Sequence, residues 1–227
     1  MGTKIKMVVF DMAGTTVNED NIVYKTLQKA INEAGFNFTL RDVLAEGAGK
    51  EKLQAIKSVL KTYAGNTDEE LADEIYGNFS KQLTAAYQSY ELFPQPNATE
   101  LFAALKERDI FRVLNTGYSK QVAQSIIDVL GWKQGQEYDE LVTATDVSGG
   151  RPEPDMIIFA ADKFKISPTE AIKVGDSAID IEEGKNANCA LSIGITTGAH
   201  TLDQLRAANP DYVIDNLIEL LPIIDNY

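Results

Sequence analysis

The sequence contains very little cysteine and histidine. Among its 227 residues, Cys189 is the only cysteine and His200 the only histidine. One cysteine excludes an internal disulfide, and one histidine argues against histidine-rich metal sites and a nucleophile–histidine–acid triad. The sequence also has no apolar run of membrane-spanning length, and its N-terminus has no basic region before a long apolar stretch. We therefore expect a cytoplasmic protein.

Basic residues are scarce as well. The chain has 21 lysines and arginines against 34 aspartates and glutamates, which gives a formal net charge of −13. Such a chain repels the phosphate backbone and anionic lipids, so we expect neither nucleic acid nor a membrane as a partner. The excess of carboxylates suits divalent cations. A homodimer is a possible assembly.

Short apolar runs alternate with helical patterns over most of the chain. The first run begins at Lys4 and ends at Asp11, and the others lie at residues 110–116, 140–144, 171–175, 190–194 and 211–214. Strand–helix alternation of this kind predicts an α/β fold with a doubly wound parallel sheet and a Rossmann-like core.

Residues 18–90 differ, because they show no strand-like run. Helical spacing predicts helices over 21–34 and 39–46, a third that starts at Lys50, and a fourth that begins near Thr67. Thr39 and Thr67 are the expected caps. The sequence thus predicts an α/β core of residues 1–17 and 91–227, with an all-helical cap domain of about 70 residues inserted after the first strand.

Acidic residues stand where predicted core strands end. Asp11 follows the first run, Asp176 follows another, and Asp180 lies one helical turn after Asp176. Parallel strands present their carboxyl ends at one edge, so we expect the three carboxylates to converge there and to bind Mg²⁺, which prefers oxygen ligands. The alternative is that each aspartate caps a helix, which is the commoner role of any single one.

Thr116 and Arg151 are the other candidates at this edge. Thr116 and Gly117 would present a hydroxyl and a backbone N–H at a helix N-terminus, an arrangement that binds phosphate oxygens. Arg151 lies in a proline-stiffened loop that could direct its guanidinium to a phosphoryl group and Asp11. A helix-capping threonine and a solvent-facing arginine are the alternatives.

Four segments make the sequence recognisable. Asp11-Met-Ala-Gly-Thr-Thr16, Asn115-Thr-Gly-Tyr118, Gly150-Arg-Pro-Glu-Pro154 and Val174-Gly-Asp-Ser-Ala-Ile-Asp180 together resemble the haloacid dehalogenase superfamily, and within it the phosphonatase branch of phosphonoacetaldehyde hydrolase and its relatives. The resemblance covers residues 4 to about 195 in motif order.

The resemblance implies a phosphoryl-transfer enzyme with an aspartyl-phosphate intermediate on Asp11. It implies that Asp11, the Ala13 carbonyl and Asp176 hold Mg²⁺, with Asp180 in support. The helical insertion would be a mobile cap that sets substrate specificity. We expect Thr116 and Arg151 to act with Asp11 in catalysis, and we expect the substrate to contact Thr15, Gly117 and Tyr118.

Ala13 departs from the ordinary phosphatases of that superfamily. They usually place an aspartate two residues after the nucleophile, where it protonates the leaving alkoxide. General acid–base help of this kind is worth about 10²–10⁴ in rate, and alanine cannot supply it. The phosphonatase branch likewise has alanine there, and it has arginine where Arg151 stands in place of the usual lysine.

The resemblance also implies a cap lysine that forms a Schiff base with the substrate carbonyl, and it places that lysine at Lys50. A helix N-terminus lowers the pKa of such an amine, whereas neighbouring Glu46 and Glu51 raise it. The alternative is that Lys50 belongs to the solvent-exposed face of an amphipathic helix. The chain also departs from phosphonatases at Leu53, where they have histidine, and at Glu46, where they have an apolar residue.

These residues predict a Mg²⁺-dependent hydrolase that cleaves the C–P bond of a 2-oxoalkylphosphonate, phosphonoacetaldehyde or an analogue. The first alternative is a phosphatase of the same superfamily that acts on a small phosphorylated metabolite. The others are a catalytically silent scaffold that binds a phosphorylated ligand and a dehalogenase, which would not need Asp176 and Asp180 together.

Overall fold

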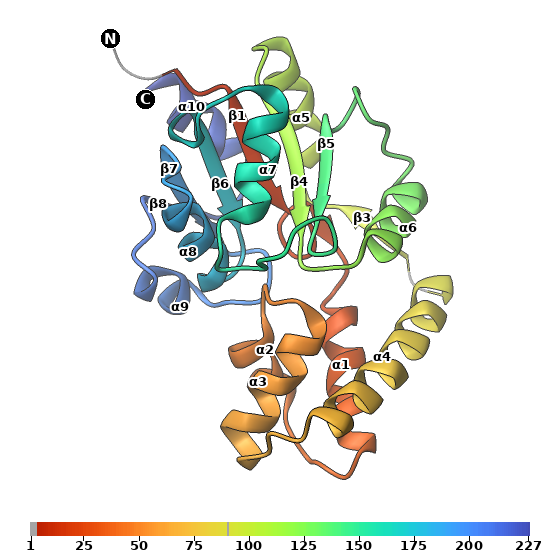
Figure 1. Cartoon of the computed structure of the whole chain (residues 1–227). Helices are drawn as coiled ribbons and strands as arrows, with labels where there is room; N and C mark the ends of the chain where they lie inside the picture. The colour runs from red at the N-terminus through yellow and green to blue at the C-terminus, as the bar shows by residue number, and fades with distance from the viewer. Residues whose placement is uncertain (1–3, 90) are drawn as a thin grey trace.

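The computed structural model describes residues 4–89 and 91–227 of the chain. A six-stranded parallel sheet lies at its centre, in the order β5-β4-β1-β6-β7-β8 (Figure 1). Its strands are β1 (Met7–Asp11), β4 (Phe111–Thr116), β5 (Glu140–Thr143), β6 (Ala171–Gly175), β7 (Leu191–Ile195) and β8 (Tyr212–Ile214). The strand order reverses at β1, and the predicted doubly wound α/β fold is confirmed.

The central strand β1 buries both of its faces. Val8 and Phe10 belong to the larger hydrophobic core on one face of the sheet, and Met7 and Val9 belong to a smaller core on the other. All four side chains are fully buried, as expected for a parallel sheet that helices cover on both faces. Figure 1 shows α7 crossing one face of the sheet. The helices of this part are α5 (Ala98–Glu107), α6 (Lys120–Leu130), α7 (Asp155–Phe164), α8 (Ala178–Asn186), α9 (Leu202–Ala207) and α10 (Leu220–Asp225), with 3₁₀ turns at Pro168–Glu170 and Leu217–Glu219.

Four further helices lie together beyond the carboxyl ends of the strands (Figure 1). They are α1 (Ile22–Glu33), α2 (Leu40–Gly47), α3 (Lys52–Ala64) and α4 (Glu69–Ser89), and we call them the helical unit. Their apolar faces continue the larger core of the sheet. The helical unit therefore stands over the edge of the sheet where the predicted site residues end their strands.

Local capping decides where these helices begin. Thr39 caps α2 as predicted, in a capping box with Asp42. At the start of α4 the cap is Asp68, whose Oδ1 accepts from the backbone N–H groups of Glu70 at 3.0 Å and Leu71 at 3.2 Å, and not the expected Thr67.

Glu51 moves the start of α3. Its carboxylate accepts the backbone N–H of Gln54 at 3.0 Å, so Glu51 is the N-cap and the helix begins at Lys52. The sequence had predicted a helix from Lys50, which instead belongs to the loop between α2 and α3. This shift of two residues decides which lysine faces the sheet.

A two-stranded antiparallel ribbon joins the two parts of the chain. Its strands are β2 (Val17–Asn18) and β3 (Phe93–Pro94), which pair Val17 with Pro94 and Asn18 with Phe93. The prediction of no strand between residues 18 and 90 is wrong at Asn18, because a two-residue strand leaves no periodic pattern. The division into residues 1–17 and 91–227 against 18–90 stays a prediction, and residues 1–3 and 90 lie outside the described part. None of the helices described is long and apolar enough to cross a membrane.

Candidate active site

The strand ends bring the predicted residues of the sheet edge together. Asp11 ends β1, Thr116 ends β4 and Asp176 follows β6, and β1 pairs with both β4 and β6. These three residues, together with Ala13 and Gly117, line one small cleft. The cleft lies where the strand order reverses, which is the usual ligand site of open α/β sheets.

Arg151 reaches this cleft from the loop between β5 and α7. Its Nη1 lies 2.7 Å from Asp11 Oδ1 and 3.0 Å from Asp180 Oδ1, and its Nε lies 3.0 Å from Glu183 Oε2. Its Nη2 donates to the Asn115 carbonyl at 2.9 Å. The side chain is 1% exposed. The solvent-facing alternative is therefore wrong, and Arg151 is positioned to hold the Asp11 carboxylate and a phosphoryl oxygen.

A second buried cation supports Arg151, and the sequence interpretation missed it. Lys173 on β6 places its Nζ 2.9 Å from Asp180 Oδ1, 3.2 Å from Glu183 Oε2 and 2.7 Å from Asn115 Oδ1. Asn115 in turn donates to Glu183 Oε1 at 2.8 Å. Lys173 interrupts an apolar strand, and Glu183 lies one turn after Asp180. Both positions indicate burial, but they are overlooked when charged residues are assumed to face solvent.

The three aspartates differ in acidity because their neighbours differ. Burial raises the pKa of Asp11, against the opposing charge of Arg151. Burial, together with repulsion from Asp11 and Asp180, raises the pKa of Asp176 well above its ordinary value. Burial also acts to raise the pKa of Asp180, but Arg151 and Lys173 outweigh it and lower that pKa to about 2.

The residues around Asp11 and Asp176 fit Mg²⁺. Both carboxylates and Ala13 line the cleft, and both aspartates have raised pKa values because no opposing charge fully compensates them. Among the described residues, no three or more histidine, cysteine, aspartate or glutamate side chains are grouped to hold a metal. Mg²⁺ suits such a sparse set, since it is commonly bound by one or two carboxylates and keeps several waters.

Three predicted residues lie outside the lining of this cleft, and two of them, Asp180 and Thr15, are buried behind it. Asp180 is fully buried against Arg151 and Lys173, and its Oδ2 accepts from the Ser177 hydroxyl at 2.5 Å, so it joins the ion-pair network behind the cleft. Thr15 is also fully buried, and its hydroxyl donates to Asp176 Oδ1 at 3.5 Å. Thr15 therefore orients Asp176 and does not face the space where a substrate would lie.

The lysine in the cleft is Lys52. It lines the cleft with Asp11, and it is 5% exposed. Its Nζ donates to the Lys50 carbonyl at 2.8 Å and to Tyr24 Oη at 3.3 Å. Burial lowers the pKa of Lys52 to about 8, against the opposing charges of Asp11 and Glu19. The neutral form of this amine is therefore far more common near neutral pH than that of a lysine with an ordinary pKa.

Lys50 does not reach the cleft. Its Nζ donates to the Ser58 hydroxyl at 3.1 Å, and Lys50 is absent from the residues that line the cleft. The structure does not bring Lys50 to Asp11, because Glu51 starts α3 at Lys52 and leaves Lys50 in the preceding loop.

Aromatic rings enclose the Lys52 amine. Nζ lies 4.8 Å from the centroid of the Tyr24 ring and 5.1 Å from that of Tyr118. Tyr118 also lines the cleft, and its hydroxyl donates to Glu19 Oε2 at 3.3 Å. Rings at these distances stabilise the charged amine while they exclude water. Tyr118 and Gly117 thus lie at the site as predicted, whereas Tyr24 and Glu19 were not identified from the sequence.

The helical unit closes tightly over the sheet edge. The Gly49 carbonyl lies 3.5 Å from Arg151 Nη1, and a Cβ on Gly117 would lie 3.0 Å from the Lys50 carbonyl oxygen. The cleft beneath has a volume of about 10 Å³, which holds no more than about one water molecule. With the helical unit in this position the cleft is too small for a phosphoryl group.

Known proteins resemble this chain in sequence. The family model described as haloacid dehalogenase-like hydrolase matches residues 8–193. A protein of Latilactobacillus sakei named phosphonoacetaldehyde hydrolase is 30% identical, over 99% of this chain and 97% of its own length. A protein of Vibrio vulnificus named phosphoglycolate phosphatase is 28% identical, over 97% of this chain and 96% of its own.

A solved structure extends the comparison to the fold. The phosphonoacetaldehyde hydrolase-like protein from Oleispira antarctica matches with a TM-score of 0.83 at 25% identity, and the match covers 99% of this chain and 92% of that one. The resemblance of the four sequence segments is thereby confirmed. The chain belongs to the haloacid dehalogenase-like hydrolases, and it is a hydrolase with phosphonoacetaldehyde hydrolases among its relatives.

Proposed function

We propose that this hydrolase cleaves the C–P bond of a 2-oxoalkylphosphonate through a Schiff base on Lys52 and a phosphorylated Asp11. The observation behind the proposal is the buried, pKa-lowered Lys52 amine in the same cleft as Asp11. Cleavage of a C–P bond expels a carbanion, and a protonated imine on the neighbouring carbon accepts its electron pair.

The reaction has two covalent stages. The neutral Lys52 amine adds to the carbonyl carbon, one proton is taken up from solvent, and water leaves, which gives a protonated imine. A carboxylate oxygen of Asp11 then attacks phosphorus, the C–P bond breaks, and its electron pair moves to the imine nitrogen to form an enamine. Protonation of the enamine carbon and hydrolysis release the carbonyl product and free Lys52, and water hydrolyses the aspartyl phosphate to phosphate.

The other residues position the phosphoryl group. Arg151 holds Asp11 at 2.7 Å and supplies positive charge for the phosphoryl oxygens. The Thr116 side chain and Gly117 stand beside it at the N-terminal side of α6. Asp11, Asp176 and the Ala13 carbonyl would hold Mg²⁺, which when bound neutralises negative charge in the cleft.

A phosphatase acting on a phosphorylated metabolite is the second candidate, and the Vibrio relative supports it. Ester cleavage expels an alkoxide, which benefits from a general acid near the nucleophile. Ala13 lines the cleft at that place without a carboxyl group. An enamine leaving group takes its proton at carbon later, so the absence of an acid at Ala13 favours the C–P reaction.

Reductive trapping tests the proposal. Phosphonoacetaldehyde and borohydride, added together with Mg²⁺, should leave a reduced adduct on Lys52. Cleavage after glutamate separates the two candidates, because Lys50 falls in the peptide 47–51 and Lys52 opens the next one. Mass and fragmentation should place an ethyl adduct on Lys52 of the parent protein. In the Asp11→Asn variant the adduct on Lys52 should be phosphonoethyl, because the C–P bond is not cleaved. A peptide 47–51 that bears the adduct, or no adduct at all, contradicts the assignment.

Closure of the helical unit gives a further prediction. Gly117→Ala should lower kcat by about tenfold or more, equivalent to about 1.4 kcal/mol, because the new Cβ meets the Lys50 carbonyl and holds the helical unit open. Steady-state phosphate release measures it. Gly77→Ala is the control, since Gly77 lies within α4 and a Cβ added there would have nothing within 4 Å. Equal kcat values for the Gly117 variant and the parent protein would show that closure does not limit the reaction.

A further inference from the structure

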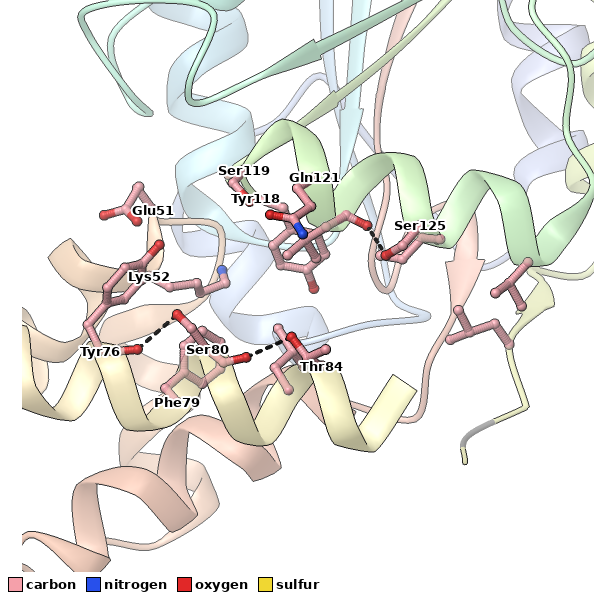
Figure 2. Close-up of a pocket in the computed structure, with 16 residues that line it drawn as sticks. Glu51, Lys52, Tyr76, Phe79, Ser80, Thr84, Tyr118, Ser119, Gln121 and Ser125 are labelled. Atoms are coloured by element: carbon pink, nitrogen blue, oxygen red, sulfur yellow. Dashed lines mark hydrogen bonds between the residues drawn. The ribbon is translucent and has the colours of Figure 1, made fainter. Parts of the chain in front are cut away.

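A second and much larger cavity adjoins the cleft. Its volume is about 610 Å³, and it lies between α4 of the helical unit and α6 beside the sheet (Figure 2). Lys52, Gly117 and Tyr118 line both spaces. The proposed imine would therefore form at the junction, with the phosphoryl group on the side of Asp11 and the rest of the substrate on the side of the cavity.

The walls of this cavity are largely apolar. Phe79 and Leu83 come from α4, and Leu92 lies just before β3; α6 contributes Val122, Ile126 and Val129. Phe79, Leu83, Leu92 and Ile126 are buried. A cavity of this size falls within the range of small-molecule sites, which are predominantly lined by apolar and aromatic side chains.

Three of the hydroxyl groups in the walls do not direct their protons into the cavity, while the polar residues Ser119 and Gln121 line it at the start of α6. Ser80 donates to the Tyr76 carbonyl at 2.9 Å, Thr84 to the Ser80 carbonyl at 3.0 Å, and Ser125 to the Val122 carbonyl at 2.8 Å (Figure 2). Each hydrogen bond returns to the residue's own helix. These positions therefore offer no strong donors to an occupant.

The described residues of the cavity walls also offer no cation that would bind a second anion. The charged residues among them are Lys52, which belongs to the cleft, and Glu51, which caps α3 through the backbone N–H of Gln54 at 3.0 Å. A carboxylate or phosphate in this space would meet apolar walls and Glu51, at a considerable desolvation cost. The occupant that suits these walls is uncharged and mainly apolar.

We infer that the cavity binds an apolar substituent on the carbonyl carbon of the substrate, of arylalkyl or branched alkyl type. This inference rests on the proposed function. In phosphonoacetaldehyde the corresponding substituent is a hydrogen atom, which would leave the whole cavity unused. For scale, an apolar cavity of about 150 Å³ binds benzene, so this one has room for a group larger than a phenyl ring.

Two ketones of matched reactivity test the inference. In 2-oxopropylphosphonate the substituent is methyl, and in 2-oxo-4-phenylbutylphosphonate it is a phenylethyl group whose ring is insulated from the carbonyl. With Mg²⁺ present, kcat/KM for phosphate release should be at least about tenfold higher for the phenyl compound, a modest value for one well-filled apolar pocket. Equal values would overturn the inference.

A variant that fills the cavity sharpens the test. Ser125→Trp places a large ring at the wall on α6, and it should lower kcat/KM for the phenyl ketone at least about tenfold while that for the methyl ketone changes less than about twofold. Gln124→Trp is the matched control, because Gln124 is exposed on the same helix and does not line the cavity. Equal losses for both ketones in Ser125→Trp would contradict a substituent pocket.

Binding separates failure of this inference from failure of the proposed function. If neither ketone nor phosphonoacetaldehyde releases phosphate, C–P cleavage is wrong, but the cavity is still tested with 4-phenylbutylphosphonate and methylphosphonate, which have no carbonyl. Calorimetry should show at least about tenfold tighter binding of the phenyl compound to the wild type, and no such preference in Ser125→Trp. Equal affinities overturn the inference. So does a wild-type dimer that Ser125→Trp converts to a monomer, since a second copy would then occupy the cavity.

Discussion

Asp11→Asn should lower phosphate release at least about 10⁴-fold, which corresponds to about 5.5 kcal/mol of transition-state stabilisation. An amide is a poor nucleophile towards phosphorus, and its nitrogen cannot form the acyl phosphate. The variant also removes one of the two carboxylates that would hold Mg²⁺. The other carboxylate that lines the cleft, Asp176, would hold Mg²⁺ in the proposed mechanism, so no second nucleophile is assigned there.

Folding must be separated from chemistry in that variant. The amide oxygen of the substituted side chain can still accept from Arg151, which in the parent protein lies 2.7 Å from Asp11 and also pairs with Asp180 and Glu183. We therefore expect the variant to fold, with a Tm close to that of the parent protein. Asp128→Asn is the control, because Asp128 is exposed on α6, and it should keep full activity. Appreciable turnover by a folded Asp11→Asn protein would contradict an aspartyl-phosphate mechanism.

The strand ends of this fold could be predicted from the sequence because the pattern there is strong. A buried strand must be apolar throughout, so a polar residue at its end is conspicuous, and parallel strands place such residues at one edge. Asp11, Thr116 and Asp176 were found in this way, and the structure brings them into one cleft. Arg151 was placed by its motif, and its partners then follow from the geometry.

Burial of charge could not be predicted in the same way. Lys173 and Glu183 are charged residues in a chain with many, and only the three-dimensional packing shows that each is fully buried in an ion-pair network. Asp180 looked like a further metal group because it lies one turn after Asp176, but Arg151 and Lys173 hold it in the ion-pair network behind the cleft.

A single cap determines which of Lys50 and Lys52 lies in the cleft. Both lysines flank Glu51, and the composition of this segment favours neither one. Once Glu51 accepts the backbone N–H of Gln54, α3 begins at Lys52 and its side chain turns towards Tyr24 and the sheet edge. Capping preferences allow this start but do not require it, since helix ends are the least certain part of any sequence-based assignment.

The second large effect is expected at Lys52. Lys52→Arg should lower C–P cleavage at least about 10³-fold, or about 4 kcal/mol, because a guanidinium keeps the charge but cannot form an imine. Lys50→Arg is the matched control, two residues away, and it should stay within about threefold of the parent protein. Steady-state phosphate release from phosphonoacetaldehyde measures both. Loss of activity in Lys50→Arg together with retained activity in Lys52→Arg would indicate that the Schiff base forms on Lys50.

The pH dependence of kcat/KM should report the pKa of the same amine. With a pKa of about 8, about one-tenth of Lys52 is neutral at pH 7, against about one in 3,000 for a lysine with an ordinary pKa. The kcat/KM for C–P cleavage should therefore rise with pH and level off near pH 8. The groups that act on this amine are Asp11, Glu19, Tyr24, Glu51, Tyr118 and Arg151. A profile that keeps rising towards pH 10 would exclude Lys52 as the attacking amine.

The lowered pKa of Lys52 should also carry a cost in stability. Because this pKa falls on folding, the unfolded chain binds more protons than the folded chain between about pH 8 and pH 10.5. The contribution of Lys52 to stability therefore improves as pH rises through that window, and it is least favourable below it. Lys52→Met should therefore raise the free energy of unfolding at pH 7, by as much as about 3 kcal/mol before the lost contacts with the Tyr24 and Tyr118 rings are subtracted. The gain should vanish above about pH 10.5. Denaturant unfolding at the two pH values measures this, and a Lys52→Met protein that is less stable than the parent protein at pH 7 would contradict the expected stability cost of the buried amine.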